Sequence, residues 1–169
     1  AILDLCTGSG CIAISLALEY PDASIWATDV SIKALNVARE NAKSFNVEVH
    51  FLESDLLKTA PPVDYTQFDL IISNPPYIPE SEISITDANV KDVEPHLSLF
   101  VTGNDPLLFY NRIAEESSRF LKIGGICVVE INRNFGKKVC SIFEQAGFEN
   151  IEVFKDMSGN ERFVKAIKT

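Results

Sequence analysis

The sequence lacks an excess of basic residues. Its 169 residues include 15 Lys and Arg against 24 Asp and Glu, which gives a formal net charge of -9. Surfaces that bind nucleic acid by neutralising phosphates concentrate Lys and Arg. The charge balance therefore disfavours free nucleic acid as the main partner, and we expect no direct nucleic-acid binding.

Long apolar runs and paired cysteines are also missing. No stretch reaches the roughly 18 consecutive apolar residues of a transmembrane helix, and no basic region followed by a short apolar run opens the chain. The four cysteines form no CxxC pair of the kind that zinc sites use. They are Cys6, Cys11, Cys127 and Cys140. We interpret all four as reduced core residues and expect a soluble cytoplasmic enzyme with no membrane partner.

Hydrophobic residues make up 46% of the sequence, which is enough for one well-buried core. We therefore expect a single domain over residues 1–169. Ala1 opens directly on the apolar run AILDL, with no Met and no polar lead-in. From this we expect that the chain lacks part of its N-terminus.

Short apolar runs alternate with stretches of helical periodicity, which predicts an α/β fold with parallel strands joined by helices. Strands are expected at residues 1–6, 24–29, 47–53, 68–73, 125–131, 151–155 and 162–168. Helices are expected at 11–20, 32–46, 106–121 and 135–146, with helix stops at Pro21, Gly124 and Gly147. The pattern predicts a seven-stranded, mostly parallel, Rossmann-like sheet with helices on both faces.

The last two expected strands are separated only by residues 156–161, which include Ser158, Gly159 and Asn160. So short a turn cannot hold a crossover helix, so the last strand should be antiparallel. Residues 75–105 show no helical pattern and contain several prolines and acidic residues. Long irregular segments of compact domains usually form lids or binding loops.

The first expected strand ends in DLCTGSGC, where glycines would let the backbone turn tightly and approach a ligand. Gly8 and Gly10 occupy this turn, and Ala13 stands where the full GxGxxG pattern has its third glycine. Asp29 follows Gly10 by 19 residues, where a carboxylate can accept hydrogen bonds from both hydroxyls of a ribose. Asp55 ends the third strand. These features together predict a nucleoside-like ligand at one edge of the sheet.

Simpler explanations exist for each of these residues. The glycines could form only a tight turn, Asp29 could cap the helix that starts near Ile32, and Asp55 could be a solvated loop acid. Asp4 is a carboxylate inside an apolar strand and therefore needs partners. We expect it to hydrogen-bond the glycine turn or to reach the amino group of a ligand.

The fourth strand, FDLIIS, runs into Asn74, Pro75, Pro76 and Tyr77 at the same expected edge. The prolines fix the backbone, so the nearby carbonyls become rigid acceptors, and Asn74 adds a side-chain carbonyl. Two fixed acceptors suit a planar NH₂ group, and Tyr77 offers an aromatic face against it. Hydrogen bonds to both protons would raise the electron density on a nitrogen that is otherwise a poor nucleophile. The alternative is a rigid turn that merely leaves the strand.

Beside a sulfonium methyl donor, such a nitrogen could react by direct in-line displacement, which depends on positioning and on electrostatic stabilisation. The sequence shows no Ser-His-Asp set or nucleophile elbow, and neither His50 nor His96 lies in a motif that marks a base.

These motifs resemble class I S-adenosylmethionine-dependent methyltransferases and, within them, the HemK/PrmC-type protein glutamine methyltransferases. The resemblance covers essentially the whole chain through DLCTGSGCIAI, TDVSIKALNVARENA, FDLIISNPPYI, EPHLSLFVTGNDPLLFY and the ending that includes KDMSGNERFV. It implies N5-methylation of the glutamine in the Gly-Gly-Gln loop of peptide chain release factors, with S-adenosylhomocysteine as the second product. A release factor is therefore the expected partner.

The resemblance also implies roles for individual residues. Gly8, Gly10 and Asp29 would hold the methionine and ribose parts of the cofactor, and Asp55 its adenine. Asn74 with Pro75 would hold the substrate amide. The expected cofactor-binding set is Asp4, Thr7, Gly8, Gly10, Asp29, Asp55 and Asn74. The expected catalytic set is Asn74, Pro75, Pro76 and Tyr77, and no metal ligand is expected.

Two departures from the family stand out. We expect the family's N-terminal recognition domain to be missing from these 169 residues, and Asn132 stands in EINRN where the family often has glycine. Three alternatives stay open. They are methylation of a ribosomal-protein glutamine, methylation of an exocyclic amine of a nucleic acid base, and a non-enzymatic cofactor-binding subunit. A base methyltransferase would need a flipped base and a basic channel.

Overall fold

A computed structural model describes residues 1–63, 67–76, 78–79, 100–101 and 105–169. Along the chain it contains β1 (Ile2–Leu5), α1 (Cys11–Glu19), β2 (Ile25–Asp29), α2 (Ile32–Ser44), β3 (His50–Glu53), β4 (Phe68–Ser73), β5 (Ile78–Pro79), β6 (Phe100–Val101), α5 (Leu108–Phe120), β7 (Leu121–Glu130), α6 (Gly136–Gln145), β8 (Phe148–Lys155) and β9 (Glu161–Lys168). All seven expected strands and all four expected helices are present.

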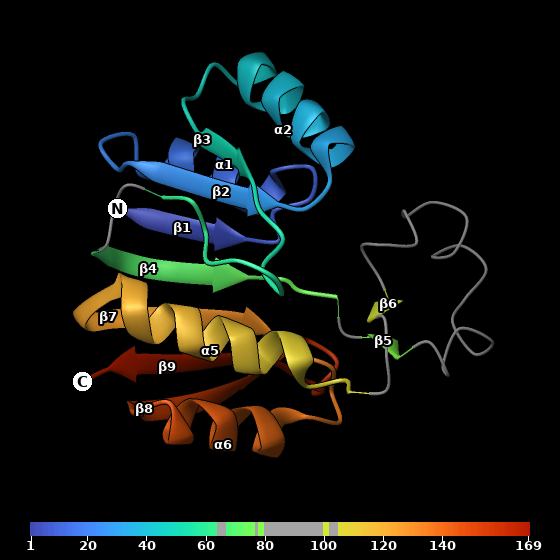
Figure 1. Cartoon of the computed structure of the whole chain (residues 1–169), viewed down its shortest axis with the longest axis vertical. Helices are drawn as coiled ribbons and strands as arrows, with labels where there is room; N and C mark the ends of the chain where they lie inside the picture. Colours follow the sequence, from blue (N-terminus) through green and yellow to red (C-terminus); the bar gives the residue numbers. More distant parts are fainter. Residues whose placement is uncertain (64–66, 77, 80–99, 102–104) are drawn as a thin grey trace.

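Seven strands form one sheet in the order β3-β2-β1-β4-β7-β9-β8 (Figure 1). The pairs β2–β3, β1–β2, β1–β4 and β4–β7 are parallel, whereas β9 is antiparallel to both β7 and β8. The expected reversal of the last strand is therefore confirmed. Its cause is the short connection between β8 and β9, which leaves no room for a crossover helix.

Helices cover both faces of the sheet, as expected. Successive side chains of a strand point to opposite faces, and β1 shows the result. Ile2 packs in a cluster with Ala13 and Ala17 of α1. Leu3 and Leu5 belong to the larger cluster, which includes residues of α5 and α6. In Figure 1, α5 and α6 lie in front of the sheet and α1 lies behind it. The central strand is therefore buried on both faces, as parallel sheets require.

Some expected boundaries were wrong. The third helix ends at Phe120, so Gly124 is not its stop and lies inside β7. Leu121 is already extended and pairs with Phe68 of β4, and the register shifts between Phe68 and Leu70. Pairing with a strand some 50 residues away decides where this strand begins, and local sequence does not reveal it. Likewise, β3 begins only at His50, whereas β8 begins earlier than expected, at Phe148.

The expected irregular segment contains two short strands at its described residues, β5 and β6, which pair in parallel. These strands are two residues long each, and the described residues of the segment contain no helix, in line with the missing helical pattern. The rest of the segment, including Tyr77 and His96, lies outside the described residues. Among the helices that the structure describes, none is both long and apolar enough to cross a membrane.

The cysteines are free, as expected, but they are not all core residues. Cys127 is buried and accepts a hydrogen bond from the Ser117 hydroxyl at 3.3 Å, whereas Cys11 is exposed. Cys11 is the first residue of α1, and an apolar neighbourhood in the sequence did not predict that this end of the helix faces solvent.

Candidate active site

The candidate site lies where four adjacent strands end, at the carboxyl edge of β3, β2, β1 and β4. Leu5 pairs with Thr28 on one side and with Ser73 on the other. From β1 the chain moves outward through β2 to β3 and then returns to β4, on the opposite side of β1. The strand order therefore reverses between β1 and β4, and ligands of open α/β sheets bind at such a reversal.

The turn after β1 has the backbone conformation that its glycines allow. Gly8 and Gly10 have φ values of 58° and 83°. A Cβ on Gly8 would meet no atom within 4 Å, so this side of the turn is open to a ligand. A Cβ on Gly10 would lie 3.0 Å from the Cβ of Ala38, so Gly10 also lets α1 and α2 approach closely. Cys6 shares the left-handed conformation, with φ 61°.

Asp29 joins the glycine turn to the second helix. Its Oδ2 accepts a hydrogen bond from the Gly8 amide at 2.8 Å, and its Oδ1 accepts one from the Ser31 amide at 2.8 Å. The residue that caps α2 is Ser31, whose hydroxyl accepts from the Ala34 amide. Asp29 therefore does not cap the helix itself. Each carboxylate oxygen has more than one acceptor site, so both can still accept a hydroxyl of a ribose.

Asp4 is fully buried behind the turn. Its Oδ2 accepts a hydrogen bond from the Thr7 hydroxyl at 2.5 Å, which confirms the expected link to the glycine turn. Its Oδ1 has no hydrogen-bond partner at normal distance among the described residues. Burial raises the pKa of Asp4 to about 7, and the hydrogen bond from Thr7 and a weaker interaction with the Ala13 backbone amide oppose this only in part. A buried acceptor without a partner beside an open turn fits the amino group of a ligand.

Asp55 follows β3 and is held by its own loop. Its Oδ1 accepts from the Leu57 amide at 3.1 Å, and its Oδ2 lies 2.8 Å from Nζ of Lys58. Hydrogen bonding from Lys58 is the main cause that lowers the pKa of Asp55. The Lys58 side chain is 80% exposed, so this ion pair contributes little to the stability of the loop. Asp55 is thus an ionised acceptor at the edge of the site.

The loop after β4 begins beside the glycine turn. The buried Ser73 hydroxyl donates to the Leu5 carbonyl at 2.8 Å, which ties the ends of β4 and β1 together. Asn74 follows and is exposed, whereas Pro75 is buried and Pro76 is half-buried. The expected acceptor Asn74 is therefore presented to solvent on an anchored backbone. Tyr77, the fourth expected catalytic residue, lies outside the described residues.

Asn132, the departure from the family's glycine, has a local structural role. Its Oδ1 accepts from the Asn134 amide at 3.0 Å, and its own amide donates to the Tyr110 hydroxyl at 3.2 Å. Asn132 is not among the described residues with a positive φ. The turn that leaves β7 therefore does not require a glycine, and the asparagine stabilises it.

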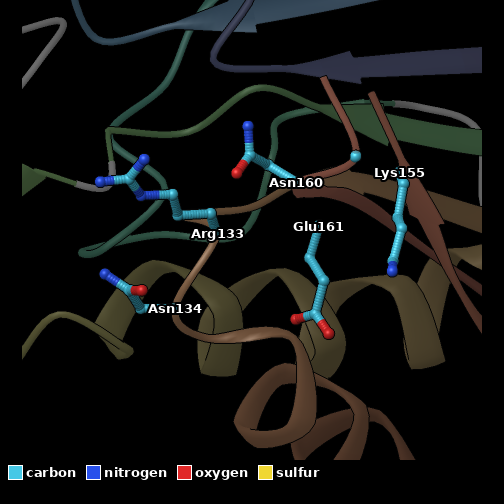
Figure 2. A pocket seen from close by; sticks show the side chains of 6 residues that line it. Arg133, Asn134, Lys155, Asn160 and Glu161 are labelled. Carbon is cyan, nitrogen blue, oxygen red and sulfur yellow. The ribbon is translucent and has the colours of Figure 1, made fainter. Parts of the chain in front are cut away.

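A polar hollow of about 490 Å³ lies elsewhere on the same edge. It is lined by Arg133, Asn134, Lys155, Gly159, Asn160 and Glu161. These residues come from the loop after β7 and from the turn between β8 and β9, so the hollow does not include the ends of β1 to β3. In Figure 2 the side chains of Arg133 and Lys155 lie on opposite sides of the view. No expected cofactor-binding residue lines it.

Sequence reasoning missed three residues that shape the candidate site. Ser31 caps α2, and a serine just before a helical pattern is a known signal for this role. Ser54 is buried, and its hydroxyl has no hydrogen-bond partner among the described residues. Arg112 of α5 reaches the loop of Asp55. No sequence signal identifies the last two, because their surroundings are assembled from distant segments.

Comparison with known proteins supports the methyltransferase interpretation. The sequence model of the methyltransferase small domain family matches residues 1–98. A protein of Flavobacterium psychrophilum named "Release factor glutamine methyltransferase" is 47% identical over 165 residues, which are 97% of this chain and 57% of that protein. A Bacteroides thetaiotaomicron protein of the same name is 42% identical and is matched over 98% of this chain and 59% of its own length. The resemblance drawn from the sequence motifs is thereby confirmed.

Solved structures share the fold. A methyltransferase from Pyrococcus furiosus superimposes with a TM-score of 0.71 at 20% identity, over 99% of this chain and 74% of that chain. TrmN from Thermus thermophilus gives a TM-score of 0.68 at 22% identity, over 99% of this chain and 43% of its own. At these identities the likeness concerns the fold alone. The sequence match over residues 1–98 shows that the chain belongs to the methyltransferase small domain family.

Proposed function

We propose that this chain transfers a methyl group from S-adenosylmethionine to the side-chain amide nitrogen of a glutamine in a peptide chain release factor. The observation that carries the proposal is the position of Asn74 and Pro75 at the end of β4, directly beside the glycine turn that follows β1. The names of the relatives support the choice of substrate. The chain spans 57% to 59% of the length of these relatives, and we assign residues 1–169 to the catalytic domain.

The residues present fit the proposed cofactor. The open side of Gly8, the remaining acceptor sites of Asp29 and the unpartnered oxygen of Asp4 suit an amino acid joined to a ribose. Asp55 would accept a hydrogen bond from the adenine. When bound, S-adenosylmethionine supplies an electrophilic methyl group on a sulfonium centre. The expected cofactor-binding set also contains Thr7, Gly10 and Asn74. Thr7 and Gly10 keep Asp4 and the turn in place, and we assign Asn74 chiefly to the substrate.

The acceptor loop would orient the substrate. The Asn74 side-chain carbonyl and a neighbouring backbone carbonyl would each accept a hydrogen bond from one proton of the glutamine amide. These bonds would orient the amide nitrogen for methyl transfer and would stabilise the positive charge that develops on it. Pro75 and Pro76 would restrict the backbone, and Tyr77 would lie against the amide plane. The proposed substrate places the reaction in the cytoplasm.

The first test is to incubate the protein with radiolabelled S-adenosylmethionine and, in separate reactions, with release factor, ribosomal proteins and DNA. Label should map by mass spectrometry to the glutamine of a Gly-Gly-Gln loop. Label found only on a ribosomal protein or on DNA would contradict the proposed substrate and would favour one of the other acceptors. Cofactor binding without label on any acceptor would favour a non-enzymatic subunit.

A variant separates the two parts of the site. Asn74→Ala should lower the rate of methyl transfer on the order of 100-fold, with nearly unchanged cofactor affinity, because the substrate uses this acceptor. Asn36→Ala is the matched control, since Asn36 is an exposed asparagine on α2. Steady-state kinetics and calorimetry of S-adenosylhomocysteine binding measure the two quantities. An equal loss of cofactor binding would contradict the role of Asn74.

A further inference from the structure

Arg112 connects α5 to the loop that follows β3. Its Nε donates a hydrogen bond to the Leu56 carbonyl at 2.9 Å, across 56 residues of sequence. Leu56 is 5% exposed and belongs to the large apolar cluster under α5. The contact therefore joins the loop to the body of the protein at the residue next to Asp55.

The Arg112 guanidinium is itself held in one orientation. Its Nη2 lies 2.6 Å from Oε1 of Glu116, and its Nη1 lies 2.6 Å from Oε2 of Glu115. Glu116 is fully buried, and a buried carboxylate needs a paired cation. Each of the three guanidinium nitrogens of Arg112 thus contacts a different oxygen, on Leu56, Glu115 and Glu116. A lysine at this position has no such fork and could not make all three contacts with the same geometry.

Asp55 lies between two anchored residues, since the Ser54 amide donates to the Asp29 carbonyl at 2.9 Å and the Leu56 carbonyl accepts from Arg112. Within its loop, the carboxylate is bonded to the Leu57 amide and to the exposed Lys58. Both partners belong to the same short turn, so neither of them anchors the loop to the sheet or to a helix. The Leu56 backbone, one residue away, is the part of this turn that Arg112 holds.

We propose that Arg112 is a positioning residue that sets the selectivity of the cofactor site for the base of the ligand. It acts through Leu56 to place the Asp55 carboxylate where it accepts a hydrogen bond from an exocyclic amine of the base. The inference rests on the proposed role of Asp55 in cofactor binding. A carboxylate at that place favours an amino group and disfavours a carbonyl oxygen, because it is an acceptor only.

The test compares the affinities of two ligands by calorimetry. S-adenosylhomocysteine carries a 6-amino group, and S-inosylhomocysteine carries a 6-oxo group at the same place. The wild-type protein should prefer the first by about tenfold or more, which is the effect of one hydrogen bond to a charged group. In Arg112→Lys, which keeps a cation for Glu116, the preference should fall to about twofold. A purely structural loss would weaken both ligands equally and leave their ratio unchanged.

Two further variants guard against misfolding and loss of charge. Arg112→Met combined with Glu116→Leu removes the buried charge together with its partner and keeps the apolar packing. It should show the same reduced preference. Arg119→Met is the matched control, because Arg119 also approaches Glu116, at 3.4 Å, without a hydrogen bond to Leu56. Its preference should equal that of the wild type, and a thermal denaturation curve for each variant confirms the fold.

Asp55→Asn distinguishes the two ways in which the inference can fail. If Asp55→Asn abolishes the preference and Arg112→Lys keeps it, Arg112 is not a positioning residue. If Asp55→Asn itself keeps the wild-type preference, the proposed adenine contact is wrong and the inference about Arg112 falls with it. If the wild-type protein binds neither ligand, the proposed function itself is contradicted.

Discussion

At the scale of single residues, the carboxylates of the candidate site differ because their surroundings differ. Asp4 is fully buried, and burial raises its pKa to about 7 although the Thr7 hydroxyl donates a hydrogen bond to it. Asp55 lies in a solvated turn beside Lys58, which lowers its pKa. The sequence indicated that Asp4 needs partners, and it left open whether the turn or a ligand provides them. The structure confirms the turn through Thr7, and the ligand stays a prediction.

The raised pKa of Asp4 makes stability depend on pH. The ordinary pKa of an aspartate is 3.8, so the folded protein binds more protons than the unfolded chain between about pH 4 and pH 7. Stability is therefore lost through this group as pH rises across that window. Replacing Asp4 with Asn removes the effect. Relative to Asp4→Asn, the wild-type protein should lose up to about 3 kcal/mol of unfolding free energy between pH 5 and pH 8.

Urea unfolding of both proteins at the two pH values measures this difference. Titration of the other groups is common to both proteins and cancels. Asp22→Asn, at an exposed position, is the control and should show no such change. If the difference in unfolding free energy between wild type and Asp4→Asn is the same at pH 5 and pH 8, Asp4 does not have a raised pKa.

At the scale of elements, local sequence predicted every main helix and strand, and the errors occur where distant strands pair. The helices begin and end within a few residues of the expected positions, because periodicity and turn residues are local signals. The early start of β7 at Leu121 depends on Phe68 of β4. The position of Arg112 under the loop after β3 likewise depends on how α5 packs, and no pattern around Arg112 indicates it.

The packing of α1 against α2 predicts different roles for the two glycines of the turn. Gly10→Ala should destabilise the protein by about 2–3 kcal/mol, because the substitution adds both a positive-φ strain and a clash with Ala38. Gly8→Ala has the same strain without the clash, so it should cost about 1 kcal/mol. Chemical denaturation without ligand measures both. Equal losses would show that the approach of the two helices does not explain Gly10.

At the scale of the whole molecule, the expected cofactor residues come from the ends of four neighbouring strands. Binding of the ligand should therefore stabilise the whole domain as one cooperative unit. S-adenosylhomocysteine at 100 times its dissociation constant should stabilise the chain by about 2.7 kcal/mol. For a domain of this size, that corresponds to a rise in Tm of roughly 5–10 °C. Thermal denaturation with and without ligand measures it.

Asp29→Ala is the informative variant for this experiment. It removes the acceptor that faces the proposed ribose and frees the Gly8 amide, so the rise in Tm on adding the ligand should be much smaller than in the wild-type protein. A wild-type Tm that does not change at saturating ligand would contradict the proposed cofactor. An undiminished rise in Asp29→Ala would contradict the assignment of Asp29 alone.

The sequence by itself determined the α/β class, the order of the elements, the reversal of the last strand and the motifs of the candidate site. These features depend on local periodicity, on turn chemistry and on connection length, all of which can be read along the chain. It also indicated that the glycine turn, Asp29 and Asn74 lie at one edge, since the ends of parallel strands share an edge.

The tertiary structure decided which strands are neighbours and what surrounds each side chain. It places β1 between β2 and β4, and the Ser73 hydroxyl bonds to the Leu5 carbonyl. Asn74, which follows β4, therefore lies beside the glycine turn that follows β1. It also shows that Ser31 and not Asp29 caps α2, that Cys11 faces solvent, and that Arg112 holds the turn beside Asp55. Burial and contacts between segments tens of residues apart arise only when the whole chain packs, and no local pattern encodes them.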